Sequence, residues 1–212
     1  MRIGILGSGL MGAKLGRLWA RCGHAVTFAY SRDGAKLQRL ARDSGGANGS
    51  VAEAVRDADA LLLAVHWSRI EDVLAQAGDL DGRIVLNCCV PLDEANQDLV
   101  IGTTTSGAEE LRRLRPKARW VSSFNTSPSE SFEPVFEAKS KDPHPHLLVY
   151  GDDAGAKEVA GDLIRDIGFE PQDAGGLHTA RFVEPFAMVT AELAYGQPGG
   201  PALTYRFEKL RS

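Results

Sequence analysis

The sequence predicts an α/β fold in which helices cover both faces of a doubly wound, mostly parallel sheet, with a small C-terminal helical element. Three observations predict it. Short apolar segments such as 61–65 have the composition of strands buried on both faces, as in parallel sheets. Segments with helical spacing alternate with them along the chain. A glycine-rich turn joins the first strand to the first helix; it reads Gly7-Ser8-Gly9-Leu10-Met11-Gly12.

The elements follow in order from the hydrophobic pattern. A short apolar strand at 2–6 precedes the glycines, a helix at 11–22 follows them with one apolar stripe, and 25–30 is a second strand. Further strands are expected at 61–65, 84–86, 120–121 and 147–150. Helices fit between them, and capping boxes are expected at Ser50 with Glu53, Ser68 with Glu71, and Ser106 with Glu109.

The C-terminal third is less regular. Residues 127–145 contain four prolines and are expected to form a loop with short helical turns. A last helix from about Leu177 is expected to be interrupted by Pro185, and residues 202–207 to be extended. The apolar surface of that helix exceeds what one sheet edge needs, so we expect it to contribute to a homodimer interface or to a ligand pocket.

Composition restricts the class of protein. The chain has 212 residues, 43% of them hydrophobic, and a formal net charge of −4. It can bury a sizeable core, and it lacks the basic excess that a nucleic-acid partner requires. No apolar run of about 18 residues predicts a membrane span, and no signal peptide is expected. The three cysteines have no metal-ligand spacing, so we expect no metal site and a cytoplasmic location.

The glycine loop predicts a Rossmann-like dinucleotide site. It follows a strand directly and opens an amphipathic helix, which is the context such a loop requires. Gly7 allows the tight turn, Gly9 lets the backbone approach a pyrophosphate, and Gly12 lets helix and strand pack closely. The pyrophosphate is expected at the helix N-terminus, where free N–H groups favour negative charge.

The residues after the second strand favour NADP over NAD. Ser31 and Arg32 stand where NAD sites place an acidic residue, and a hydroxyl and a guanidinium suit a 2′-phosphate. Lys36, one helical turn later, adds a positive charge or is a solvated lysine. Asp33 is the acidic alternative, although its position suits the cap of the next helix.

With these residues in view, the chain resembles the NADP oxidoreductases that use the deazaflavin coenzyme F-420 (also written F420). It is also similar to the cytosolic reductase domain of the six-transmembrane metalloreductases. Beyond the glycine loop, Ser31, Arg32 and Lys36, the resemblance rests on five segments. These are Ala64-Val65-His66-Trp67, Ser123-Phe124-Asn125-Thr126, Tyr150-Gly151-Asp152-Asp153, Asp173-Ala174-Gly175-Gly176-Leu177 and Ala180-Arg181-Phe182-Val183-Glu184.

The resemblance implies further cofactor contacts. Ala64, Val65, His66 and Trp67 would lie over the diphosphate and the nicotinamide ribose, and Asn125, Thr126 and Ser127 would line the nicotinamide. The F-420 enzymes tend to have Pro at position 66 and His at position 125. The Asn-Thr pair is closer to the metalloreductase branch.

We therefore expect an NADP(H)-binding domain over 1–175 and a small C-terminal cap or dimerisation element over 176–212. The expected activity is hydride transfer between NADP(H) and a small-molecule redox acceptor, either coenzyme F-420 or a flavin. A metalloreductase-like NADPH:flavin or ferric reductase and a non-catalytic NADP(H) sensor remain open. A relative of the β-hydroxyacid dehydrogenases is disfavoured, because the chain lacks room for their large helical domain.

No catalytic dyad is expected, since hydride transfer needs positioning more than acid–base help. His66 is either a proton donor or a polar pocket wall. Cys88 and Cys89 are expected to be small buried residues. Arg181 and Glu184, three apart on one helix, could pair with each other.

Overall fold

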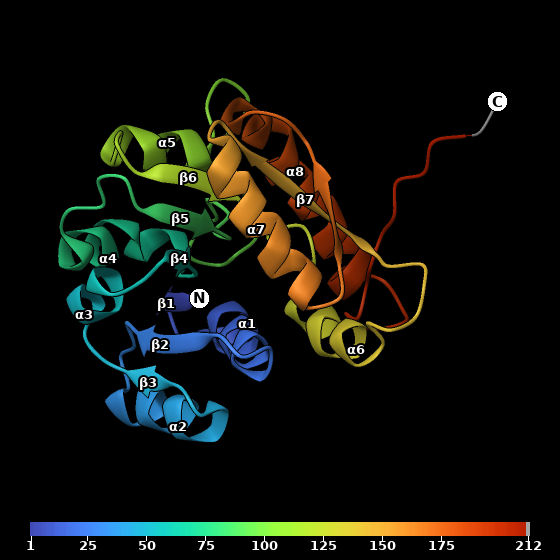
Figure 1. Ribbon diagram of the computed structural model, residues 1–212. Helices are drawn as coiled ribbons and strands as arrows, with labels where there is room; N and C mark the ends of the chain where they lie inside the picture. The colour runs from blue at the N-terminus through green and yellow to red at the C-terminus, as the bar shows by residue number, and fades with distance from the viewer. Residues whose placement is uncertain (211–212) are drawn as a thin grey trace.

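The computed structural model describes residues 1–210, which form an eight-stranded sheet (Figure 1). The strand order is β3-β2-β1-β4-β5-β6-β7-β8, and only the β6–β7 pair is antiparallel. The strands are β1 Arg2–Leu6, β2 Ala25–Ala29, β3 Ala47–Asn48, β4 Ala60–Leu63, β5 Ile84–Asn87, β6 Arg119–Ser122, β7 His146–Gly151 and β8 Glu170–Asp173. The predicted α/β fold with a Rossmann-like, mostly parallel sheet is confirmed.

Helices cover both faces of this sheet. They are α1 Leu10–Arg21, α2 Gly34–Ser44, α3 Val51–Arg56, α4 Ile70–Ala77, α5 Gly107–Leu114, α6 Phe132–Glu137, α7 Ala154–Asp166 and α8 Ala180–Ala191. One apolar core takes residues from α1, α2, α6 and α7, and a second core takes residues from α3, α4, α5 and α8. Successive residues of β1 serve opposite cores, Ile5 the first and Leu6 the second, as the alternation of a strand requires.

Two strands at the edges of the sheet were not predicted. β3 is two residues long and exposed, and β8 reads Glu170-Pro171-Gln172-Asp173. Neither has the apolar alternation that marks a strand in a sequence, because an edge strand is paired on one side only. Pro171 is compatible with an edge, where a missing N–H leaves no partner unsatisfied.

The last helix is not interrupted by Pro185, contrary to the sequence-based expectation. Helix α8 continues through the proline to Ala191 and then widens into a π-helical turn, η4 Glu192–Gly196. Val183 and Ala187 are buried on either side of Pro185, so packing holds the helix although one backbone hydrogen bond is lost. The following chain returns to the sheet, where the backbone oxygen of Tyr205 accepts from the His146 N–H at 2.9 Å.

The helix caps agree with the sequence at two places and differ at one. Ser50 and Glu53 form the complete capping box of α3, and the Ser106 hydroxyl accepts from the Glu109 N–H at the start of α5. Ser68 caps nothing; instead the imidazole of His66 accepts from the Ser68 N–H and begins a 3-10 turn, η1 Trp67–Arg69. Helix α4 therefore begins at Ile70, one residue later than a cap at Ser68 implies. No helix within residues 1–210 is both long and apolar enough to cross a membrane.

Candidate functional site

The glycine loop lies between β1 and α1, where β1 and β4 are neighbours and the strand order reverses. Gly7 has φ +124°, and a Cβ there would lie 2.2 Å from the backbone oxygen of Ala64. A Cβ on Gly12 would lie 1.9 Å from the backbone oxygen of Gly7, so only glycine allows the helix to approach the loop. A Cβ on Gly9 would meet no protein atom within 4 Å, which leaves open space above the N-terminus of α1.

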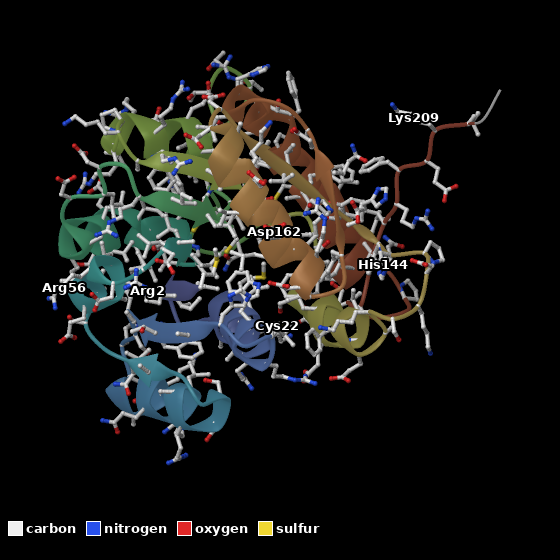
Figure 2. The ribbon with its side chains drawn as sticks, viewed as in Figure 1. Arg2, Cys22, Arg56, His144, Asp162 and Lys209 are labelled. Atoms are coloured by element: carbon white, nitrogen blue, oxygen red, sulfur yellow. The ribbon has the colours of Figure 1, made fainter. Side chains whose placement is uncertain are left out.

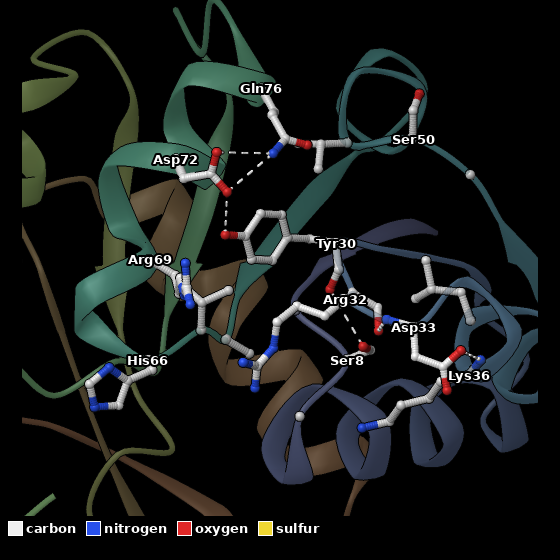
Figure 3. Close-up of a pocket in the computed structure, with 18 of the residues that line it drawn as sticks. Ser8, Tyr30, Arg32, Asp33, Lys36, Ser50, His66, Arg69, Asp72 and Gln76 are labelled. Carbon is white, nitrogen blue, oxygen red and sulfur yellow. Dashed lines mark hydrogen bonds between the residues drawn. The ribbon is translucent and has the colours of Figure 1, made fainter. Parts of the chain in front are cut away.

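A first cavity of about 760 Å³ opens beside this loop, and its walls come from the carboxyl ends of β1, β2 and β4. Arg32, Lys36 and Arg69 reach it from three different elements (Figure 3). None of these three cations forms an ion pair with another residue of the described chain. Asp33 and Asp72 also line this cavity, so three cations stand against two carboxylates and the lining carries a net charge of +1.

The two carboxylates in the wall of the first cavity already have partners. Asp33 caps α2 by accepting from the N–H groups of Ala35 and Lys36, which confirms the capping interpretation. Asp72 accepts from the Tyr30 hydroxyl and from the side chain of Gln76, and these bonds lower its pKa. Burial and the bond to Asp72 raise the pKa of Tyr30 to about 12. Both acids therefore stay ionised and engaged near neutral pH.

A second cavity of about 380 Å³ adjoins the first, and Gly9, Ala64, Val65 and His66 line both. Its remaining wall comes from the start of α1, from the segments that follow β5 and β6, and from the helical segment 187–195. No Asp, Glu, Lys or Arg is among its lining residues. The buried Oδ1 of Asn125 and Oγ of Ser127 have no hydrogen-bond partner in the described chain. This cavity is therefore uncharged and offers two free polar atoms.

The structure brings most of the predicted site residues to these two cavities. The first cavity is lined by Gly7, Ser8, Gly9, Ser31, Arg32, Lys36, Ala64, Val65 and His66. The second is lined by Gly9, Leu10, Met11, Ala64, Val65, His66, Asn125 and Ser127.

Three predicted site residues line neither cavity. Gly12 lies beneath the loop against Gly7. Trp67 begins η1 and faces a different groove, beside Ile70 and Ile101. Thr126 is fully buried, and its hydroxyl bonds the Tyr205 hydroxyl at 2.6 Å. The sequence shows that these residues lie near the strand ends, but it does not show which neighbouring side chains face the cavities.

Other lining residues were missed by sequence reasoning. Arg69 is one of them, and its position shortly after β4 is the sequence signal that could have identified it. Ala187, Thr190 and Tyr195 come from a helix far along the chain, and no local pattern connects them with the glycine loop.

His66 has both ring nitrogens engaged. Its Nδ1 accepts from the Ser68 N–H at 3.2 Å and lies 2.9 Å from the Ser68 hydroxyl, while Nε2 lies 3.0 Å from the backbone oxygen of Asp93. A backbone N–H can only donate, so Nδ1 carries no proton and the Nε2 N–H donates to Asp93. This arrangement supports the role of a polar pocket wall.

Arg181 and Glu184 do not pair with each other. Arg181 binds Glu109 through two hydrogen bonds of 2.7 and 2.8 Å. The carboxylate of Glu184 is 1% exposed and accepts from the N–H groups of Gly107 and Ala108 at 2.8 and 3.0 Å. Burial raises the pKa of Glu184 to about 7 despite these bonds. Both residues thus fasten α8 to the N-terminus of α5.

Cys88 and Cys89 are buried, as expected. Burial raises the pKa of Cys89 to about 12 and that of Cys88 well above its usual range, so both remain thiols. Residues 1–210 contain no group of three or more His, Cys, Asp or Glu side chains placed to hold a metal ion.

The glycine loop at the switch point and the adjoining cavities define a dinucleotide-binding protein of the Rossmann class. Residues 2–91 match the family model described as NADP oxidoreductase, coenzyme F420-dependent, so the resemblance predicted from the sequence is confirmed over this part of the chain. The chain is 26% identical over 189 residues to the metalloreductase STEAP3 of Rattus norvegicus. That match covers 86% of this chain but only 36% of the relative, so the chain spans about a third of its length.

Two solved structures share the fold over nearly the whole chain. A candidate F420-dependent NADP-reductase of Arthrobacter sp. FB24 has a TM-score of 0.87 and 23% identity, and the match covers 99% of this chain and 100% of that one. A hypothetical protein of Sinorhizobium meliloti, SMa0349, has a TM-score of 0.71 and 26% identity, with 98% and 96% covered.

Proposed function

We propose that this protein transfers hydride between NADP(H) and a deazaflavin or flavin acceptor. The observation that carries the proposal is the contrast between two joined cavities. The first has three unpaired cations at one end, and the second has an uncharged wall. A 2′-phosphorylated adenosine suits the first, and a nicotinamide beside a flat ring suits the second. The diphosphate would cross the N-terminus of α1 between them.

The residues present fit this cofactor on structural grounds. The unmatched charges of Arg32, Lys36 and Arg69 suit a 2′-phosphate, with the Ser31 hydroxyl beside them. The open space above Gly9 suits a diphosphate at the loop. The free oxygen atoms of Asn125 and Ser127 suit the polar group of a nicotinamide.

The bound NADP(H) supplies the hydride, and the chain's own residues bind, orient and exclude water. Met11 and Val65 are apolar residues of the second cavity's lining and would pack against the reacting rings. No ionised side chain lines that cavity, which suits hydride transfer and disfavours acceptors that carry a carboxylate at the reacting centre. A small hydroxy acid would need a cation there.

The F-420 deazaflavin is our first choice of acceptor. A metalloreductase-like activity toward flavin or ferric chelates is the second candidate, because Asn125 and His66 depart from the F-420 enzymes and a metalloreductase is among the relatives. An NADP(H) sensor without turnover is the third.

Stopped-flow absorbance separates these three functions. NADPH is mixed with oxidised F-420, then with FMN, FAD and ferric chelates, and the loss of reduced cofactor is followed. Reduction of F-420 is the expected result. Reduction of flavin or iron alone would support the metalloreductase-like activity. Tight NADPH binding without any turnover would support the sensor.

We also propose that 1–175 forms the NADP(H)-binding domain and that 176–212 is a small cap that dimerises. Phe182, Val189 and Leu193 lie along α8 and its π-helical end, and they are 67%, 53% and 53% exposed. Such a stripe is costly to leave in water. Sedimentation across micromolar concentrations tests the dimer, and a monomer at every concentration would refute it.

The free cysteines support a cytoplasmic location, which cell fractionation would test.

A further inference from the structure

A chain of hydrogen bonds joins three elements around the second cavity. The Tyr195 hydroxyl on η4 donates to Oε2 of Glu130 at 2.9 Å, and the two residues are 65 positions apart in the sequence. The Ser129 hydroxyl donates to the same oxygen at 3.2 Å, and the Lys14 ammonium group donates to Ser129 Oγ at 3.0 Å. These bonds therefore connect α1, the 3-10 turn η2 Ser129–Ser131 and the π-helical turn η4.

The direction of each bond in this chain is fixed. Although partial burial acts to raise it, the pKa of Glu130 lies below its ordinary value because Tyr195 and Ser129 donate to the carboxylate. An ionised carboxylate can only accept, and an ammonium group can only donate. Partial burial and the bond to Glu130 raise the pKa of Tyr195 to about 12, so its hydroxyl keeps the proton near neutral pH. Tyr195 is therefore the donor and Glu130 the acceptor.

Tyr195 stands where the second cavity meets solvent. It lines that cavity and is 61% exposed. None of the aromatic pairs within residues 1–210 includes its ring. The chain after η4 does not cover this rim, since no residue of 196–210 lines the cavity and Lys209 stands away from the body of the molecule (Figure 2). A tyrosine with a free ring and a bonded hydroxyl at a wet boundary is well suited to contact a ligand.

The π-helical turn places the backbone of Tyr195 without fixing its ring. Ala194 in the same turn is 1% exposed, so this end of the helix is packed on the body of the protein. Within residues 1–210, the bond to Glu130 is the only side-chain hydrogen bond from η4 to another element. Turns of this kind are frequent at functional sites. Loss of the bond should therefore release the ring and leave the fold intact.

We propose that Tyr195 is a specificity-determining residue for the acceptor, and that Glu130 is the positioning residue that holds its ring. The ring provides one wall of the second cavity, against which a flat aromatic acceptor packs. This role rests on the proposed function, because a deazaflavin or flavin ring is the acceptor that it names. Neither Tyr195 nor Glu130 lines the first cavity, so loss of their bond should weaken acceptor binding and leave NADP(H) binding unchanged.

The test measures how tightly oxidised F-420 and FMN bind to the protein saturated with NADP⁺. Both ligands fluoresce, so anisotropy titration gives their dissociation constants without turnover. Tyr195→Ala removes the ring and should weaken binding of the flat ligand about tenfold. Tyr195→Phe keeps the ring but loses the bond, and it should weaken binding about threefold. Glu130→Ala should also cost about threefold, because it acts through the same ring.

A double substitution identifies the bond itself. Tyr195→Phe combined with Glu130→Ala should weaken binding about threefold in total, since both remove one bond, whereas independent effects would give about ninefold. Glu130→Gln keeps an oxygen that can accept from Tyr195, and it should restore the affinity to within about twofold of the parent's. Glu133→Ala is the matched control, because it removes the same charge from an exposed residue of α6 and should change nothing.

The affinity for NADP⁺ separates this role from the function on which it rests. NADP⁺ should bind each variant as tightly as it binds the parent. Tyr195→Ala and Tyr195→Phe proteins that bind the flat ligand as the parent does would overturn the role while the function stands. An additive double variant, or an equal loss of NADP⁺ and flat ligand in Tyr195→Phe, would also overturn it.

The parent protein provides the remaining outcomes. A parent that binds NADP⁺ but neither F-420 nor FMN would refute the flat acceptor, and the role of Tyr195 with it. A parent that does not bind NADP⁺ would refute the proposed function itself. A loss of flat-ligand affinity in the Tyr195 and Glu130→Ala variants, with NADP⁺ binding kept, is the expected result.

Discussion

Arg32→Ala should weaken NADPH binding while NADH binding hardly changes. Arg32 follows β2 and lines the first cavity without an ion pair of its own in the described chain, so its guanidinium is free for a 2′-phosphate. A hydrogen bond to a charged group contributes about 1.5–3 kcal/mol. This range corresponds to about 10- to 150-fold in the dissociation constant. Because Arg32 is exposed and solvent screens it, we expect the lower end, about tenfold.

Fluorescence titration of NADPH and NADH with the parent and the variant measures this effect. Arg42→Ala is the control, since Arg42 lies on α2, the helix that follows Arg32, pairs with Asp43 and does not line the cavity. The difference between parent and Arg32→Ala should also shrink as salt rises, because the contact is exposed. Equal affinity of the parent for NADPH and NADH, or an equal loss of both in Arg32→Ala, would refute the 2′-phosphate assignment.

Four further changes have distinct expected results. Arg69→Ala should reduce NADPH affinity about as much as Arg32→Ala, and an unchanged titration would remove Arg69 from the site. Gly12→Ala should lower stability by about 2 kcal/mol through its clash with the loop. Gly9→Ala should unfold at the parent's temperature but lose cofactor affinity, which calorimetry and titration would distinguish. The pKa of Glu184 is raised to about 7 in the fold, so its contribution to stability is complete below about pH 4.5 and is lost as pH rises through 7. In urea unfolding between pH 5 and 8, Glu184→Gln should therefore lose less stability than the parent, and an equal loss would contradict this.

The sequence was informative where structure depends on near neighbours. The glycine loop, the strand before it and the helix after it depend on steric limits and periodicity within about 30 residues, and all were predicted. The same holds for Asp33, whose capping role needs only the next helical turn. Edge strands β3 and β8 were not predictable, because half-paired polar strands lack a hydrophobic pattern.

Contacts between distant segments account for the other differences. Arg181 and Glu184 looked like a pair at helical spacing, but each finds a better partner on α5, more than 70 residues earlier in the chain. Helical spacing brings two side chains within reach, and it does not exclude a competing partner. Pro185 shows the same limit. The hydrogen bond that α8 loses at the proline is offset by burial of neighbouring residues against distant segments, which the local sequence does not reveal.

The lining of the two cavities comes from different spans of the sequence, and this difference is relevant to the choice of acceptor. The charged cavity is built within residues 7–76, from successive strand ends and the turns that follow them. The uncharged cavity takes residues from 9–11, 64–66, 88–96, 124–129 and 187–195. Substitutions at Thr190 or Tyr195 can therefore reshape the second cavity without touching Arg32, Lys36 or Arg69. If the proposed function holds, such a chain can keep its hydride donor while its acceptor changes.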